Sequence, residues 1–239
     1  MVTIPAQFNG PVRSGNGGYV CGMLGGEHGA EIATSTLRQP PPLDTPLSWE
    51  RDSAESGGDE LRLVTAGGAI IGTATSGSFA REAVPSPTDA EAEAGHAAYR
   101  GFHTHPFDHC FTCGTKRAEG EGLRLFAGPC DVHRTATAWS PHPAFAEPDG
   151  ALNVPVSWAA LDCPGGWAAD FAERPMVLGR MTGQVLRRPR PGEDLLATGR
   201  LDEHTGRKFL TSTALYTRDG ELLGRAEQTW IEIEIADFT

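Results

Sequence analysis

The C-terminal part of the chain carries four strand-length segments in a row, and this run constrains the fold more than any other feature. The turn pairs Pro-Gly, Thr-Gly and Asp-Gly separate the segments, which read MVLGRMTGQVLRRP, EDLLATGRLDEH, KFLTSTALYTRD and ELLGRAEQTWIEIEI. Short turns of this kind join antiparallel neighbours. The sequence therefore predicts an antiparallel sheet over residues 176–235.

A helix is predicted directly before this run, in VPVSWAALDCPGGWAADFAE. Pro155 suits the first turn of a helix, whereas Pro164 and the two glycines after it are expected to kink or end it. Two strands, GLRLFAGP and DVHRTATAWSP, precede the helix. The predicted order in the second half is strand, strand, helix and four antiparallel strands.

The first half repeats the later part of this order. A short helix in GNGGYVCGMLGG is followed by a proline-marked strand and by strands in SWERD, ELRLVTAG and AIIGTATSGSF. Three positions align at one constant offset: Leu37, Pro40 and Pro42 with Leu186, Pro189 and Pro191. Glycine and proline punctuation can make two β-rich segments look alike, but the ordered match favours an internal duplication.

Residues 81–104 separate the two halves. The stretch is rich in Ala, Glu and Pro and poor in large apolar residues, which is typical of a linker with one exposed helical turn. We therefore expect an N-terminal unit over residues 1–80, a linker over 81–104 and a C-terminal unit over 105–239.

Charge and cysteine content limit the partners and the compartment. The formal net charge is −11, which argues against nonspecific binding to nucleic acid or to an anionic membrane, since both need a basic face. No apolar run approaches the roughly 20 residues of a membrane span, and the N-terminus does not read as a secretory signal. With five cysteines in no dense framework, we expect a cytoplasmic protein with reduced thiols.

These features together resemble the hotdog-fold thioesterase superfamily. The resemblance rests on LDCPGGWAA and on residues 184–227, with their Arg-Pro-x-Pro-Gly strand end and Tyr…Asp-Gly hairpin. HCFTCGTKRAEGEGLRLF is also similar to the Cys-x-x-Cys-Gly opening of some members. The resemblance implies an α+β double hotdog, in which two antiparallel sheets form one continuous surface and each is wrapped around a central helix.

The resemblance also implies an activity, the hydrolysis of an acyl thioester without a cofactor. Acyl-CoA or an acyl-carrier-protein thioester would be the partner molecule. Sites of the family lie between two hotdog units, where a helix N-terminus of one unit binds the thioester carbonyl and the facing helix supplies a carboxylate. We expect a tunnel for the acyl chain between the units, and a homodimer is compatible with this architecture.

Asp162 is the carboxylate that fits this scheme. It lies among apolar neighbours in VSWAALDCPGGWAA, where burial is costly unless partners compensate. Asn16, Gly17 and Gly18 form a helix start, whose free amides can stabilise a developing oxyanion. We assign Asp162 and Asn16 as catalytic and Gly17 and Gly18 as substrate-binding, with Asp162 activating water or attacking the thioester directly.

Each assignment has a structural alternative. Asn16 can simply cap its helix, and Asp162 can bind exposed backbone amides around residues 164–166. The pseudo-symmetric second site is poorer, because its helix start over 152–154 would face Glu27, which we expect in an exposed turn.

Arg187 and Arg188 are a further pair of substrate-binding candidates. They lie in the basic run LRRPRP, which can meet the phosphates of CoA. The alternative is a solvated strand end.

Cys110 and Cys113 have the spacing of zinc ligands, and histidines in FHTHPFDHCFTCG could complete a tetrahedron. A second Cys-x-x-Cys motif is missing, and Cys130 and Cys163 are isolated in the sequence. We therefore expect no metal site, and we expect Cys163 to behave as a small hydrophobe.

Two other functions stay open. The weak second site and the short first helix fit a non-catalytic acyl- or CoA-binding or assembly protein. A hotdog lyase such as an enoyl hydratase would need a paired His and Asp, and the sequence offers no convincing pair.

Overall fold

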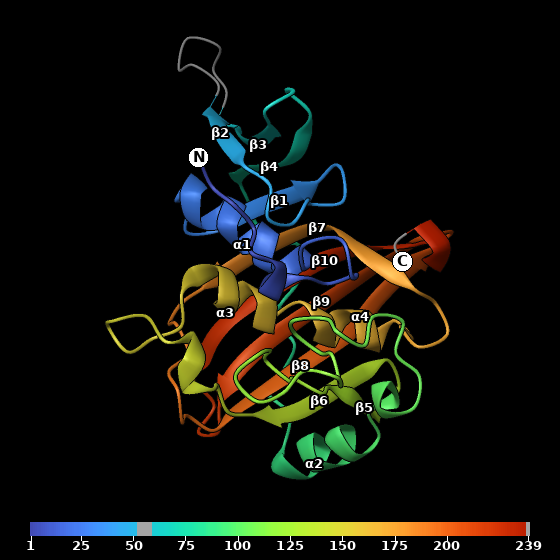
Figure 1. The fold of residues 1–239 in the computed structure, drawn as a ribbon. Coiled ribbons are helices and arrows are strands. Elements are labelled where there is room, and N and C mark those ends of the chain that lie inside the picture. The colour runs from blue at the N-terminus through green and yellow to red at the C-terminus, as the bar shows by residue number, and fades with distance from the viewer. Residues whose placement is uncertain (52–58, 238–239) are drawn as a thin grey trace.

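One antiparallel sheet of ten strands forms the centre of the molecule (Figure 1). The structure is a computed structural model that describes residues 1–51 and 59–237. The strands are β1 (Ala33–Leu37), β2 (Leu47–Arg51), β3 (Leu61–Thr65), β4 (Ile70–Ser76), β5 (Gly128–Asp131), β6 (Arg134–Trp139), β7 (Met176–Val185), β8 (Leu195–Thr205), β9 (Lys208–Thr217) and β10 (Leu222–Glu232). The α-helices are α1 (Gly17–His28), α2 (Asp89–Ala97), α3 (Val154–Ala160) and α4 (Cys163–Ala168).

The strand order is the same on both sides of the central β1–β7 pair. From this pair outward it reads β1-β4-β3-β2 on one side and β7-β10-β9-β8 on the other, with β6 and β5 beyond β8. The predicted turns at Gly206 and Gly220 join β8 to β9 and β9 to β10, and both glycines have the positive φ that such turns require. The four strands predicted between residues 176 and 235 all lie in this antiparallel sheet, which continues through β1 into the first half. The Pro-Gly turn, however, does not join neighbours, because β7 pairs with β1 and β10 whereas β8 pairs with β6 and β9.

The predicted helix over residues 154–173 is broken into two helices. α3 ends at Ala160, and α4 begins at Cys163. Pro164 lies in the first turn of α4, where a missing N–H leaves no hydrogen bond unmade. The proline therefore starts the second helix rather than ending the first, and the break itself falls on Leu161 and Asp162.

Glycines bring α1 into very close contact with α3. A Cβ atom added at Gly22 would lie 2.7 Å from Pro155 Cα, and one at Gly25 would lie 2.8 Å from Trp158 Cζ2. Side chains at these positions would force the helices apart. The glycine-rich helix therefore packs its buried face directly on α3, and the start of α1 meets the end of α3.

Residues 81–104 pack on the sheet, whereas the sequence predicted an exposed helical turn. Thr88 and Glu91 form a capping box at the start of α2, which packs on β5 and β6. Within β8, Leu195 belongs to the main core and Leu196 to a separate cluster with Ala92 of α2. Because neighbouring strand residues face opposite sides, α2 covers the face of the sheet opposite to α4.

In the part of the chain that the structure describes, no helix is both long enough and apolar enough to cross a membrane.

We predict that Gly22→Ala lowers the free energy of unfolding by about 1–3 kcal/mol, since the added methyl group overpacks the α1–α3 contact. Gly26→Ala is the matched control, because its Cβ would lie an ordinary 3.4 Å from Val154 Cγ1. The control should be neutral or stabilising by up to about 1 kcal/mol through helix propensity. Urea unfolding of both variants measures this, and equal effects would contradict the packing account.

Candidate active site

Asp162 faces the first turn of α1 from the break between α3 and α4. Its Oδ2 accepts hydrogen bonds from Asn16 Nδ2 at 2.9 Å and from the Gly18 amide at 3.0 Å. A Cβ atom at Gly18 would lie 2.5 Å from Asp162 Cβ, so only glycine allows this approach. The structure thus brings together Asp162, Asn16 and Gly18 from distant parts of the sequence.

The second carboxylate oxygen of Asp162 is free. Within residues 1–51 and 59–237, Oδ1 is buried and has no hydrogen-bond partner. The side chain also makes no capping bond to α4, so the predicted alternative of binding amides around residues 164–166 does not describe its contacts. Asp162 is 2% exposed and is one of the residues that line a pocket, and its carboxylate has one anchored and one unpaired oxygen.

Burial raises the pKa of Asp162 from 3.8 to about 7, and the nearby Cys110 adds to the rise. The hydrogen bonds from Gly18 and Asn16 favour the charged form and oppose this rise. A carboxylate with a pKa near neutrality can accept a proton from water and release it again, as a general base must.

The Gly17 amide is the unpaired donor at this helix start. Asn16 caps α1 by accepting a hydrogen bond from the Tyr19 amide at 2.9 Å, and Gly18 binds Asp162. The Gly17 N–H has no acceptor in the described parts of the chain, and Gly17 lines the same pocket. Of the two amides expected to be free, only that of Gly17 is available to a ligand.

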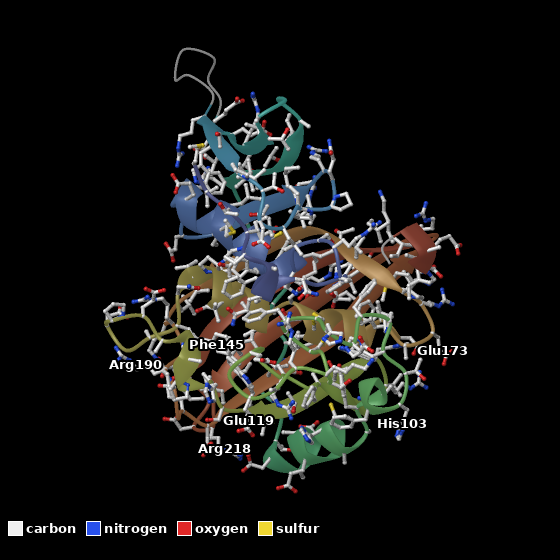
Figure 2. All side chains as sticks on the ribbon, viewed as in Figure 1. His103, Glu119, Phe145, Glu173, Arg190 and Arg218 are labelled. Carbon is white, nitrogen blue, oxygen red and sulfur yellow. The ribbon has the colours of Figure 1, made fainter. Side chains whose placement is uncertain are left out.

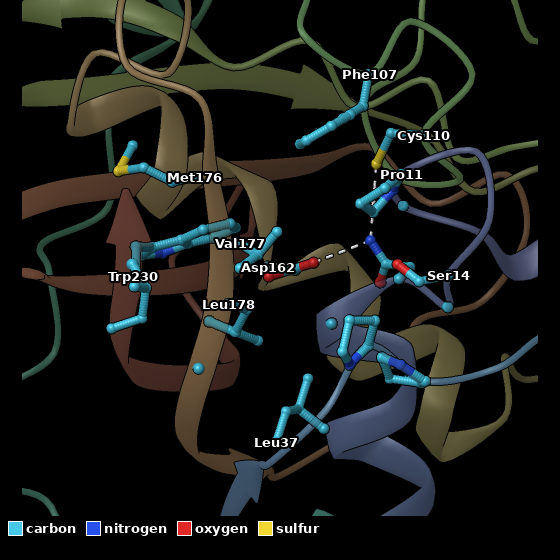
Figure 3. Close-up of a pocket in the computed structure, with 18 of the residues that line it drawn as sticks. Pro11, Ser14, Leu37, Phe107, Cys110, Asp162, Met176, Val177, Leu178 and Trp230 are labelled. Atoms are coloured by element: carbon cyan, nitrogen blue, oxygen red, sulfur yellow. Dashed lines mark hydrogen bonds between the residues drawn. The ribbon is translucent and has the colours of Figure 1, made fainter. Parts of the chain in front are cut away.

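The pocket beside Asp162 has a volume of about 210 Å³ and largely apolar walls. Figure 3 shows Asp162 at its centre, between the first turn of α1 and strand β7. The deep wall is formed by large side chains of the second half, Phe107, Phe171, Met176, Leu178 and Trp230, and the rim by residues 37–41 of the first half. A register shift opposite Gly179 gives β7 a bulge at this wall.

Polar side chains of β9 and β10 fix the break that carries Asp162. Gln228 Nε2 donates to the carbonyls of Leu161 and Asp162 at 2.8 and 2.9 Å. Thr213 Oγ1 also donates to the Leu161 carbonyl, at 2.7 Å. Sequence reasoning missed these residues, although a signal existed: Gln228 has the same strand parity as the apolar Ala226 and Trp230, so a polar group there points into the core.

The predicted arginine pair does not reach this pocket. Arg187 pairs with Glu193 and Glu221, and Arg188 pairs with Asp149 at a second recess. Figure 2 shows the neighbouring Arg190 at the edge of the molecule. Arg187 and Arg188 are thus engaged by carboxylates, and neither lines the pocket.

The second recess corresponds to the pseudo-symmetric site but is built differently. Asn153 caps α3 by accepting from the Val156 amide at 2.8 Å, as Asn16 caps α1. Its Nδ2, however, donates to the exposed Glu147 at 3.2 Å. Glu27 lines the recess in the last turn of α1 and is exposed, so no buried carboxylate was found there among the described residues.

The structure places Cys163 against Cys110 and Cys113. The three sulfur atoms lie within 4.8 Å of one another, and all five cysteines are free thiols. Spacing along the chain does not join Cys163 to the motif, since 49 residues separate it from Cys113. His103 and His109 are exposed, and Figure 2 shows His103 at the outer edge.

The chain was compared with known proteins. No family model matches it. A curated relative, the 2-oxoisovalerate dehydrogenase subunit beta of Pseudomonas aeruginosa, is 49% identical over 47 residues, which are 19% of this chain. The chain spans only 13% of that subunit's length, so the match carries no statement about function.

Solved structures match nearly the whole chain. A candidate thioesterase from Novosphingobium aromaticivorans is 15% identical, with a TM-score of 0.59 and coverage of 98% of this chain and 94% of that one. A hot dog fold protein of unknown function from Alicyclobacillus acidocaldarius is 13% identical, with a TM-score of 0.58 over 97% and 92%. A candidate thioesterase II from Thermobifida fusca is also 13% identical, with a TM-score of 0.58 over 98% and 91%. The chain therefore has the hotdog fold.

We predict that the wild-type protein loses stability through Asp162 as the pH rises. The native pKa of about 7 exceeds the unfolded value of about 3.9. Between these values the unfolded chain holds fewer protons than the native protein, so stability falls with increasing pH. Asp162→Asn lacks this titration, and its amide oxygen can still accept from Asn16 and Gly18.

The stability of Asp162→Asn relative to wild type should therefore grow by up to about 4 kcal/mol between about pH 4 and about pH 8. Urea unfolding of both proteins in metal-free buffer at the two pH values measures the difference. A difference that stays constant, or a variant that is less stable at the higher pH, would contradict the costly burial of the charged form.

Proposed function

We propose that the protein hydrolyses acyl thioesters in the Asp162 pocket. The observation that carries the proposal is the arrangement of the Asp162 carboxylate. Its Oδ2 is held by two hydrogen bonds, its Oδ1 has no partner among the described residues, and the unpaired Gly17 amide lies at the same helix start. The hotdog fold, which the candidate thioesterases share, adds a fold-level analogy. The apolar walls suit an acyl group, and the buried carboxylate of Asp162 supplies the base.

In the proposed reaction, the thioester carbonyl oxygen accepts the Gly17 N–H, and a water molecule lies between Asp162 Oδ1 and the carbonyl carbon. Oδ1 takes a proton as the water oxygen attacks, and the amide stabilises the oxyanion that forms. The C–S bond then breaks, and the departing thiolate takes the proton from Asp162. Direct attack by Oδ1 on the carbonyl carbon is the alternative, and it forms an acyl anhydride with Asp162. Single-turnover hydrolysis in ¹⁸O-water would place the label in Asp162 only if such an anhydride forms and water then attacks the Asp162 carboxyl carbon.

Asn16 acts as a positioning residue in this scheme. Its Nδ2 holds Asp162 Oδ2 at 2.9 Å, and its Oδ1 caps α1 through Tyr19. Asn16 thereby couples the helix start that binds the carbonyl to the carboxylate that activates water.

We further infer that the chain is an internal duplication of two hotdog units, over residues 1–80 and 105–239, connected by residues 81–104. The matching strand order about the β1–β7 pair and the equivalent caps Asn16 and Asn153 support this division. The acyl chain would lie where the units meet, with one site retained.

The substrate would be a short or aromatic acyl thioester of CoA or of an acyl carrier protein. A cavity of about 150 Å³ accommodates benzene, so the volume of about 210 Å³ suits a group of moderately larger size. Since Arg187 and Arg188 lie elsewhere, the exposed Arg38 at the rim is the basic lining residue that can meet a phosphate. No described residue of the lining is a histidine, which disfavours the lyase alternative.

We expect Asp162→Asn to lower the turnover of benzoyl-CoA or hexanoyl-CoA by roughly a hundredfold or more, because general-base help contributes at least that much. Binding should persist, since the apolar walls and the Gly17 amide are unchanged. Glu27→Gln, which alters the exposed carboxylate of the second recess, is the control and should retain wild-type turnover. Steady-state hydrolysis and equilibrium binding measure the two effects.

Two results would defeat the proposal. Unchanged turnover of Asp162→Asn would end the catalytic role of this carboxylate. Absence of hydrolysis by the wild-type protein, with acyl-CoA still bound, would favour the non-catalytic binding protein instead.

A further inference from the structure

Three thiols meet at one edge of the pocket. Cys110 and Cys113 come from the turn over residues 110–114, and Cys163 is the first residue of α4. The Cys110 and Cys163 sulfur atoms are 3.8 Å apart, and all three lie within 4.8 Å of one another. Zinc–thiolate bonds of about 2.3 Å in a tetrahedron place sulfur atoms about 3.8 Å apart, so the cluster is close to the spacing of a metal site.

The backbone fixes the turn that presents two of these thiols. The Gly114 amide donates to the Cys110 carbonyl at 2.8 Å, and a Cβ at Gly114 would lie 2.5 Å from that oxygen. Tyr99 Oη donates to the Cys113 carbonyl at 2.8 Å. The thiols are therefore held in place by contacts that do not involve sulfur.

Nitrogen donors surround the cluster. Asn16 Nδ2 lies 3.7 Å from Cys110 Sγ, and the buried Trp167 Nε1 has no hydrogen-bond partner among the described residues. Such donors stabilise thiolates, whereas a thiol that packs as a hydrophobe needs none.

We propose that Cys110, Cys113 and Cys163 bind one Zn²⁺ ion as thiolates, which departs from the expectation from the sequence that the motif binds no metal and that Cys163 packs as a small hydrophobe. Three protein ligands leave a fourth position, which opens toward the pocket that Cys110 and Cys163 line and is filled by water. Binding displaces one proton from each thiol, so the ion replaces three protons and the buried site keeps one negative charge. A monovalent thiophilic ion such as Cu⁺ would leave two, which is less favourable without solvent.

The histidines of the motif are not ligands in this arrangement. His105 Nε2 lies 3.1 Å from the Cys113 carbonyl, and its Nδ1 accepts from the Phe107 amide at 3.0 Å. The third ligand therefore comes from α4, and the ion would join the 110–114 turn to the helix that follows Asp162.

Zinc titration of the reduced, metal-free protein against a chromophoric chelator tests the proposal. We expect one equivalent of Zn²⁺ per chain, with affinity lowered at least roughly a hundredfold in Cys113→Ser and Cys163→Ser, since even outer-shell changes cost up to that much. Cys130→Ser, which alters a thiol outside the cluster, should bind like wild type. Less than stoichiometric binding by the wild type, or binding that survives Cys163→Ser, would overturn the site.

Cobalt substitution of the wild-type protein keeps the test independent of variant folding. Co²⁺ should give sulfur-to-metal charge-transfer absorption of the intensity expected for three thiolates, and Zn²⁺ should displace it. Cobalt bound without this absorption would contradict thiolate ligation. Neither readout depends on thioester hydrolysis.

Discussion

The contact between Asp162 and the first turn of α1 is the interaction on which the rest of the site depends. It places a carboxylate in an apolar interior, where an unpaired charge would be strongly unfavourable. Two donors, Asn16 Nδ2 and the Gly18 amide, bind the same oxygen. Among the described residues the other oxygen has no hydrogen-bond partner, so the contact that fixes the side chain leaves half of the carboxylate unpaired.

The surrounding structure makes this contact geometrically accessible. Gly18 lets α1 approach Asp162 at the end of α3, and Gly22 lets it pack directly on Pro155, where a side chain would clash. Gln228 and Thr213 bind carbonyls left open by the break between α3 and α4. The helix is interrupted at Asp162, and side chains of the sheet compensate for the hydrogen bonds lost there.

Local patterns in the sequence predicted the elements better than their packing. Turn pairs identified the hairpins of β8, β9 and β10, because these turns need a residue with positive φ and glycine is the residue that adopts it readily. The same reasoning misplaced the helix break, since Pro164 permits both the end of one helix and the start of another. Residues 81–104 were expected to be a linker with one exposed helical turn, but the small Ala92 and Gly95 of α2 pack closely on the sheet.

The site was partly predictable for the same physical reason. Asp162 stood out as a charge among apolar residues, and Asn16 with its glycines stood out as a helix start. The inward position of Gln228, the third thiol from Cys163 and the remote position of Arg187 all depend on tertiary contacts between distant segments. The spacing of residues along the chain does not predict such contacts, although the alternation of β10 indicates that the Gln228 side chain points into the core.

A double-mutant cycle on kcat/KM tests most directly whether Asn16 acts through Asp162. Asn16→Ala should lower kcat/KM in the wild-type background, because Asp162 Oδ2 loses a donor and the carboxylate loses its orientation. In the Asp162→Asn background the same change should have little further effect, since the general base is already absent. Equal losses in both backgrounds, with folding intact, would show that the two residues act independently and would contradict the account.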